Sequence, residues 1–191
     1  MAMRATTAER RLLRLRVARS QIPEILAWAG GLTFVFGLVN YFTLPDDAPA
    51  SWVINVIFGP LFLIIALLLK RGRLPDQAAP WAWAFCSLVL VALLVNAFRL
   101  DPTPANLAYI VAVMTAFGPL THEWLPFVVA ALGMLGAVAG GFAATPAESG
   151  WEDMVVCMAG LAISAALLRL RIRALDDVAD SQVQLDHQAM F

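Results

Sequence analysis

The sequence predicts an all-α, polytopic membrane protein with six transmembrane helices. Hydrophobic residues make up 61% of the 191 residues and charged residues only 14%, whereas a soluble domain carries about 45–50% apolar and about 25% charged residues. Six long stretches contain no Asp, Glu, Lys or Arg, and the basic residues gather in alternate links between them. With a net charge of −1, this composition excludes a soluble enzyme, a disordered chain and a protein that binds nucleic acid through bulk charge.

The uncharged stretches have the length of transmembrane helices. A helix needs about 20 residues, within a range of about 17–25, to cross roughly 30 Å of hydrocarbon. Five of the six stretches fit, and the sixth becomes long enough when residues 151–153 are added at its outer edge. The stretches are residues 25–44, 52–69, 81–98, 105–121, 125–143 and 154–168.

The first stretch has features of a secretory signal, because it follows a basic segment and precedes the small-residue site Ala48-Pro49-Ala50. Its apolar run is longer than the 7–15 residues of a signal peptide, and five further stretches follow. We therefore expect an uncleaved helix. The second stretch is expected to kink at Pro60, and the third contains no proline.

The fourth and fifth stretches are separated only by the short link His122-Glu123-Trp124. A single helix over residues 105–143 would be about 58 Å long at 1.5 Å per residue, which is too long for one crossing. Pro119 and Pro126 favour a break at the link, because proline disrupts the helical hydrogen bonds. The sequence therefore predicts two helices joined by a turn.

The basic residues predict the orientation. Twelve of the 13 lie before the first stretch, in the second link or after the sixth stretch, and only Arg99 lies in an odd-numbered link. Because Lys and Arg gather on the cytoplasmic side, both termini are expected to be cytoplasmic. We therefore expect a basic segment at residues 1–24 lying on the inner leaflet, a transmembrane domain at 25–168 and a cytoplasmic segment at 169–191.

Three glycines of the fifth stretch indicate close helix packing. Gly136 and Gly140 have the spacing that lets two membrane helices approach closely, and Gly133 lies one turn earlier. Packing within the six-helix bundle is the main interpretation, and a contact between two copies of the chain is the alternative.

Several polar residues near the outer ends of the first four stretches form a candidate ligand pocket. Polar side chains in membrane helices usually face the bundle, where they find partners. A shallow outward-facing pocket for a small ligand is one hypothesis, and interfacial residues with hydrogen bonds between helices are the other. The candidate residues are Asn40, Asn55, Asn96, Arg99, Asn106 and Tyr109.

Transport and cofactor chemistry have little support. Transporters usually carry ionisable groups within their spans, and all six stretches lack Asp, Glu, Lys and Arg. The two histidines, His122 and His187, belong to no metal-ligand cluster, so no metal or cofactor is predicted. A small-solute transporter nevertheless stays open as an alternative.

The segment after Leu168 predicts a signalling helix. No Gly or Pro occurs between Leu161 and Phe191, so the sixth helix is expected to continue into the cytoplasm. Apolar residues recur there with heptad spacing over about three heptads, which is typical of a short coiled coil between two copies. Arg171 and Gln182 are its polar exceptions, and the seam is Leu168, Leu175, Val178, Leu185 and Ala189.

The last seven residues, Leu185-Asp186-His187-Gln188-Ala189-Met190-Phe191, resemble the stretch Leu-x-His-Gln-Ala-x-His/Phe that commonly leads into the GGDEF domain of bacterial diguanylate cyclases. In that family the next residues are typically Asp-x-Leu-Thr-Gly-Leu-x-Asn-Arg. The six-span layout is also similar to the membrane anchors of some bacterial class III adenylyl cyclases.

The resemblance implies a sensor and dimerisation region in the bacterial inner membrane, whose signalling helix regulates an output domain that makes cyclic di-GMP. The GGDEF catalytic and metal-binding residues are absent from this sequence, so the chain itself is not expected to be an enzyme. Its expected partners are the lipid bilayer, a second copy of the chain and a small ligand at the outer face. A membrane anchor that needs no ligand is the remaining alternative.

Overall fold

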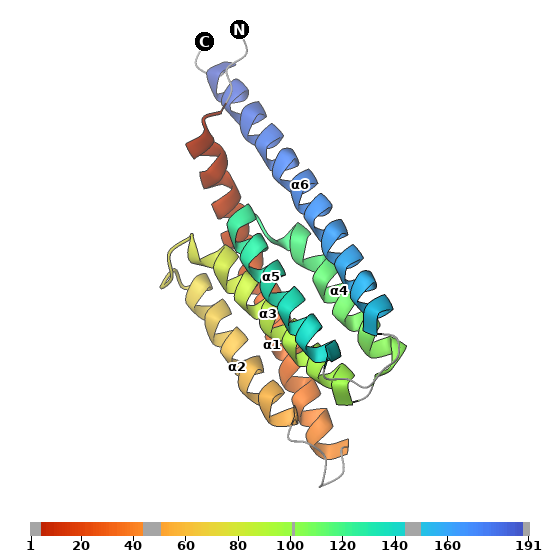
Figure 1. Cartoon of the computed structure of the whole chain (residues 1–191). Coiled ribbons are helices and arrows are strands. Elements are labelled where there is room, and N and C mark those ends of the chain that lie inside the picture. The colour runs from red at the N-terminus through yellow and green to blue at the C-terminus, as the bar shows by residue number, and fades with distance from the viewer. Residues whose placement is uncertain (1–4, 44–50, 101, 144–149, 189–191) are drawn as a thin grey trace.

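The computed structural model describes residues 5–43, 51–100, 102–143 and 150–188. Within these ranges the chain forms six helices and no strand, which confirms the all-α prediction. The helices run up and down and pack side by side, with both termini at the same end (Figure 1). They are α1 (Thr7–Thr43), α2 (Ser51–Lys70), α3 (Ala78–Leu100), α4 (Pro104–Leu120), α5 (Trp124–Ala143) and α6 (Gly150–Gln188).

Five of these helices are long and apolar enough to cross a membrane, which is the expected architecture of a membrane protein. The exception is α4, an apolar helix of 17 residues. The break between α4 and α5 lies where the prolines predicted it, because α4 ends at Leu120 and α5 begins at Trp124.

The bundle is built from pairs of helices in extensive contact: α1 with α2, α4 with α6, and α3 with α5. The close approach of α1 and α2 depends on glycine. A β-carbon on Gly30 would lie 2.8 Å from the Gly59 carbonyl oxygen, and one on Gly59 would lie 2.7 Å from the β-carbon of Phe34. Small residues at a helix contact let membrane helices gain van der Waals energy from backbone proximity.

The N-terminal basic segment is part of the first helix of the bundle. Its helix starts at a capping box, in which the Thr6 backbone N–H donates to Glu9 at 2.6 Å and the Glu9 N–H donates to the Thr6 hydroxyl at 3.3 Å. From there α1 continues to Thr43 and contains Pro23 within it. The basic residues therefore extend the first apolar helix instead of forming a separate surface helix.

The sixth helix is unbroken from Gly150 to Gln188, as the lack of Gly and Pro after Leu161 predicted. Its last turns and the first turns of α1 lie next to each other beyond the ends of the other helices (Figure 1). We name this antiparallel pair the stalk, and define it as residues 7–20 of α1 and 172–188 of α6.

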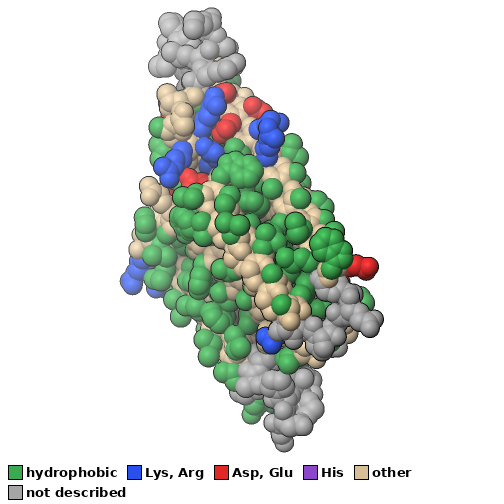
Figure 2. All heavy atoms as spheres, in the orientation of Figure 1, with side chains coloured by type: hydrophobic (Ala, Val, Ile, Leu, Met, Phe, Trp, Pro, Cys, Tyr) green, Lys and Arg blue, Asp and Glu red, His purple; other side chains and the backbone are tan. Residues whose placement is uncertain are grey.

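The surface agrees with a membrane environment. Figure 2 shows hydrophobic side chains over the middle of the molecule and most of the visible charged side chains toward the stalk. Large apolar side chains with more than half of their surface exposed occur on α1, α2, α5 and α6, for example Phe36, Ile57, Leu132 and Ile163. Such a surface is compatible with contact with a lipid bilayer.

Candidate functional site: a polar junction between bundle and stalk

The turn between α4 and α5 places two polar side chains at the base of the stalk. The α4 helix ends at Thr121, whose backbone N–H donates to the carbonyls of Phe117 and Gly118 at 3.1 and 3.0 Å. Thr121 has an extended backbone, so the chain leaves the helix at this residue. His122 follows with its side chain fully buried, and Glu123 is next to it in the turn.

His122 contacts α6 through Arg171. The Arg171 Nη2 atom lies 3.2 Å from His122 Nε2, and the same guanidinium donates to Gln21 of α1. A guanidinium can only donate, so Nε2 must be the unprotonated acceptor of a neutral imidazole. Three segments that are far apart in the sequence therefore meet at one arginine.

Burial, together with the Arg171 charge, lowers the pKa of His122 to about 4. Burial likewise lowers the pKa of Arg171. A neutral histidine is the protonation state that fits beside a buried cation. The lowered pKa and the contact with Arg171 therefore agree that His122 is neutral.

Ion pairs continue from this junction along the stalk. Arg11 of α1 pairs with Glu123 of the turn at 3.0 Å. Arg10 contacts both carboxylate oxygens of Asp180 at 3.0 Å, and the Ala5 backbone N–H donates to the same carboxylate at 2.9 Å. Both bonds come from the single Nη2 atom of Arg10, which bridges the two carboxylate oxygens.

A second stalk pair is looser. Arg14 Nε lies 3.8 Å from Asp176 Oδ1, and neither buried atom makes a hydrogen bond within the described residues. The Nε atoms of Arg10 and Arg171 are also buried without a hydrogen-bond partner there. The contact between α1 and α6 therefore contains buried arginine nitrogens whose hydrogen-bonding capacity is unused within the described residues.

Below the junction, α4 and α6 cross at very close range. The Gly118 backbone N–H donates to the Ser164 hydroxyl at 2.6 Å. The neighbouring Phe117 carbonyl accepts from Trp83 Nε1 of α3 at 3.3 Å, and the Phe117 ring stacks on Phe127 of α5 at 5.2 Å. The C-terminal end of α4 thus contacts three helices and leads directly into the buried turn.

The contacts of the junction hold helices in place. Within the described ranges there is no group of three or more His, Cys, Asp or Glu side chains that could hold a metal ion. The junction ties α6 to α1 and to the end of α4.

The residues of the predicted outer pocket lie toward the other end of the bundle and are spread over several helices. Asn55 of α2 lies against Gly37 of α1, while Arg99 of α3 lies beside Gly141 of α5. Asn96 is half-buried, and Tyr109 is 60% exposed.

Two further asparagines were proposed for that pocket. The backbone N–H of Asn106 donates to the Thr103 hydroxyl at 3.4 Å, which caps the start of α4. The side chain of Asn40 lies outside the described part of the structure. The six residues therefore lie at one end of the bundle but belong to different helix contacts.

The three packing glycines of α5 have different surroundings. A β-carbon on Gly133 would meet the Leu88 side chain of α3 at 3.0 Å, so this glycine faces the bundle. A β-carbon added to Gly136 or Gly140 would meet no other atom of the described residues within 4 Å. These two glycines face outward, which is where a contact between copies would have to form.

The predicted seam of the signalling helix also divides into two parts. Leu168 is fully buried in the bundle and Leu175 is half-buried, whereas Val178 and Leu185 are 53% and 64% exposed. Leu168 therefore packs within its own chain and is not available to a partner. Arg171, taken from the sequence as a polar exception in the seam, is the centre of the junction. Ala189 lies outside the described residues.

The junction was not predicted, although the sequence contains one signal of it. The segment before the first span is rich in arginine, whereas residues 174–188 contain acidic residues and no Lys or Arg. Opposite charges on two segments at the same side of a membrane favour their pairing.

Comparison of the chain with protein-family models, with curated proteins and with solved structures gave no match.

Proposed function

We propose that this chain is the sensor and dimerisation region of a bacterial inner-membrane protein, and that α6 regulates a GGDEF-type output domain attached after it. The chain itself binds lipid and a second copy of itself and carries no catalytic residues. The output domain would make cyclic di-GMP, and α6 would set how two such domains meet.

The observation that carries this proposal is the continuity of α6. One helix extends from the Gly118–Ser164 crossing, through the Arg171 junction, to Gln188. A rise of 1.5 Å per residue makes the part from Ser164 to Gln188 about 36 Å long. A shift or rotation of α6 in the bundle would therefore reach its far end, which a flexible linker would not allow.

The proposed topology has six spans with both termini in the cytoplasm. The α4 helix is about 26 Å long at 1.5 Å per residue, close to the hydrocarbon thickness of about 30 Å. Its two ends are capped by Thr103 and Thr121, and both neighbouring links are short. Including α4 places Arg169, Arg171 and Arg173 on the same side as Lys70, Arg71 and the arginines of α1, as the distribution of positive charge requires.

This topology is tested by fusing a reporter that works only outside the cytoplasm, such as alkaline phosphatase, after Gln188 or within the link at residues 144–149. We expect activity only for the fusion in the link. Activity of the fusion after Gln188 would remove the proposed route to a cytoplasmic output domain.

The regulatory function is tested by fusing the whole chain to a diguanylate cyclase domain and inserting one to seven residues after Gln184. Each inserted residue rotates the helix beyond it by about 100° and lengthens it by about 1.5 Å. We expect cyclic di-GMP output to depend on helical phase, with a large loss at two residues and recovery at seven. Output that is indifferent to the phase would refute control through α6.

A second candidate function is a membrane anchor that needs no ligand. It is favoured by the distribution of the proposed pocket residues, because Asn55 and Arg99 belong to different helix contacts. Under this hypothesis N55L, N96L and R99A would leave the output of the fusion unchanged. A ligand sensor would instead lose its response in at least the N96L variant, since half-buried Asn96 could offer its amide to a ligand.

A further inference from the structure

The link between α2 and α3 is a tight turn that carries three basic residues. The α2 helix ends at Lys70, and the backbone N–H groups of Gly72 and Arg73 donate to carbonyls of its last turn at 3.0 Å. Gly72 has a φ of 68°, the left-handed conformation that commonly ends a helix at glycine. The α-carbons of Lys70 and Arg73 lie at most about 11 Å apart, because three residues of chain span no more than that. The three basic residues are Lys70, Arg71 and Arg73.

The acidic charge of the link is neutralised within the protein. Residues 71–77 contain one acidic residue, Asp76, and Arg19 of α1 pairs with it. Arg19 lies directly against the turn, since a β-carbon on Gly72 would be 2.8 Å from its Nη2 atom. The three basic residues are exposed, and their side chains make no ion pair or hydrogen bond within the described residues. The link therefore carries positive charge that the described part of the protein does not compensate.

The link lies at the end of the apolar part of the bundle. The helices on either side of it, α2 and α3, are both long and apolar enough to cross a membrane. Trp81 lies in the first turn of α3 and is 43% exposed, and tryptophan is enriched where hydrocarbon meets water. Figure 2 shows basic side chains without an acidic one beside them at the edge where Figure 1 places the link. The uncompensated charge therefore lies where lipid headgroups would be.

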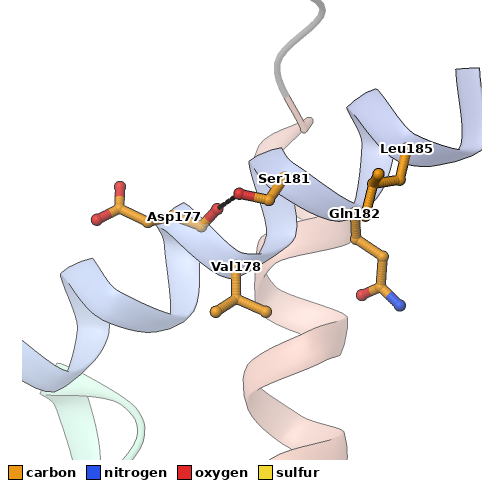
Figure 3. Close-up of a pocket in the computed structure, with 5 residues that line it drawn as sticks. All are labelled: Asp177, Val178, Ser181, Gln182 and Leu185. Atoms are coloured by element: carbon orange, nitrogen blue, oxygen red, sulfur yellow. Dashed lines mark hydrogen bonds between the residues drawn. The ribbon is translucent and has the colours of Figure 1, made fainter. Parts of the chain in front are cut away.

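The exposed arginines of α6 have different surroundings. Arg173 is followed one turn later by Asp177, and residues four apart are neighbours on a helix surface. Figure 3 shows that the Asp177 side chain points out from α6, away from Val178 and Gln182. Figure 1 places α6 and the link on opposite sides of the bundle. An anion near Arg173 would therefore meet this carboxylate, whereas an anion at the link would meet the paired Asp76.

Side chains, and not the backbone, have to recognise an anion at this turn. The N–H groups of Gly72 and Arg73 are used in ending α2, so they do not form an anion-binding nest. Guanidinium groups match the geometry of phosphate oxygens and bind them through two bonds at once. Three cations in one turn exceed the single negative charge of one phosphodiester. A lipid with two phosphates neutralises them better, and basic sites beside membrane helices bind such headgroups.

We propose that the α2–α3 link binds the headgroup of an anionic phospholipid through Lys70, Arg71 and Arg73. Cardiolipin, which carries two phosphates, is the preferred lipid, and Arg19 keeps the carboxylate of Asp76 occupied. The proposal goes beyond the proposed function and depends on neither the output domain nor the dimer. Failure of the lipid site would therefore leave the proposed regulation by α6 untouched.

The test is native mass spectrometry of the whole chain in a neutral detergent, titrated with cardiolipin, phosphatidylglycerol or phosphatidylcholine. The variant R71Q/R73Q removes two cations from the link. The matched control is R169Q/R173Q, because it removes the same charge from exposed positions of α6. A third variant, R71K/R73K, keeps the charge of the link, so it separates the effect of charge from the effect of a disturbed turn.

We expect R71Q/R73Q to raise the dissociation constant for cardiolipin about 25-fold, or about fivefold for each cation removed beside an anionic headgroup. The control should change it by less than about twofold, because exposed charges farther away than the Debye length are screened. R71K/R73K should bind nearly as tightly as the wild-type chain.

Equal weakening in R71Q/R73Q and R169Q/R173Q would overturn the site. A loss in R71K/R73K as large as in R71Q/R73Q, or equal binding of cardiolipin and phosphatidylcholine, would overturn recognition by charge. Tighter binding of phosphatidylglycerol than of cardiolipin would overturn the preference for two phosphates. Displacement of cardiolipin by an equal concentration of inorganic phosphate would assign the turn to free phosphate and overturn the lipid site.

Discussion

Replacing Gly118 by alanine is the most direct test of the packing below the junction. The new β-carbon would overlap the Ser164 carbonyl oxygen and lie 2.5 and 2.6 Å from its carbonyl carbon and hydroxyl oxygen. Ordinary contacts begin near 3.4 Å, so α4 and α6 would have to separate by about 1.5 Å to clear the Ser164 carbonyl oxygen. Overpacking of this kind costs about 1–3 kcal/mol.

Two smaller effects accompany the separation of the helices. The hydrogen bond from Gly118 to Ser164 would weaken, and such bonds contribute about 0.6 kcal/mol on average in membrane proteins. Alanine favours the helix over glycine by roughly 0.5–1 kcal/mol. These effects nearly cancel, so G118A is expected to lower the free energy of unfolding by about 1–3 kcal/mol.

The matched control is G136A, because a β-carbon on Gly136 meets no other described atom within 4 Å. In a single bundle this substitution should be neutral, or stabilise the helix by up to roughly 1 kcal/mol. The assay is reversible unfolding in mixed detergent micelles, followed by circular dichroism. Equal stability of G118A and the wild-type chain would refute the α4–α6 crossing. A destabilised G136A would mean that a second copy covers the outward face of α5.

Three further outcomes follow from the junction and stalk. Because the pKa of His122 is lowered to about 4 in the folded chain, the neutral imidazole should contribute stability that is fully present above about pH 6.5 and is lost as the pH falls toward 4. The slope would be at most about 1.4 kcal/mol per pH unit, and H122Q should remove this component from a pH series of unfolding curves. R10A and D180A should each lower the free energy of unfolding by about 0.5–1 kcal/mol. The charge-swapped double variant R10D/D180R should recover most of that loss. If the swapped variant is as unstable as the single variants, the two residues do not form a direct pair. R171M should expose the tip of α6 to limited proteolysis more than R173M does, because Arg173 is exposed and Arg171 joins three segments; equal cleavage of both would contradict the junction.

The helices were predictable because their boundaries depend on local signals. The absence of charge located the spans, Pro119 and Pro126 marked the α4–α5 break, and the run without Gly or Pro after Leu161 predicted a continuous α6. Each of these features acts within one or two helical turns.

The junction was not predictable in the same way, because it depends on distant residues. Nothing near Arg171 in the sequence indicates that it lies between His122 and Gln21, which are 49 and 150 positions away. Heptad spacing placed Leu168 in a seam between copies, whereas α6 buries it inside its own bundle. Periodicity identifies an apolar face but does not identify the neighbour that covers it.

The pairing of α1 with α6 has a consequence for biosynthesis. Arg10 and Asp180 are 170 positions apart, and the other four helices are translated in the interval between them. During that interval the basic half of α1 has no acidic helix beside it, and it acquires one only when α6 leaves the ribosome. A nascent chain that stalls within α5 would therefore leave the arginines of α1 uncovered. A quality-control protease could recognise this exposed basic segment.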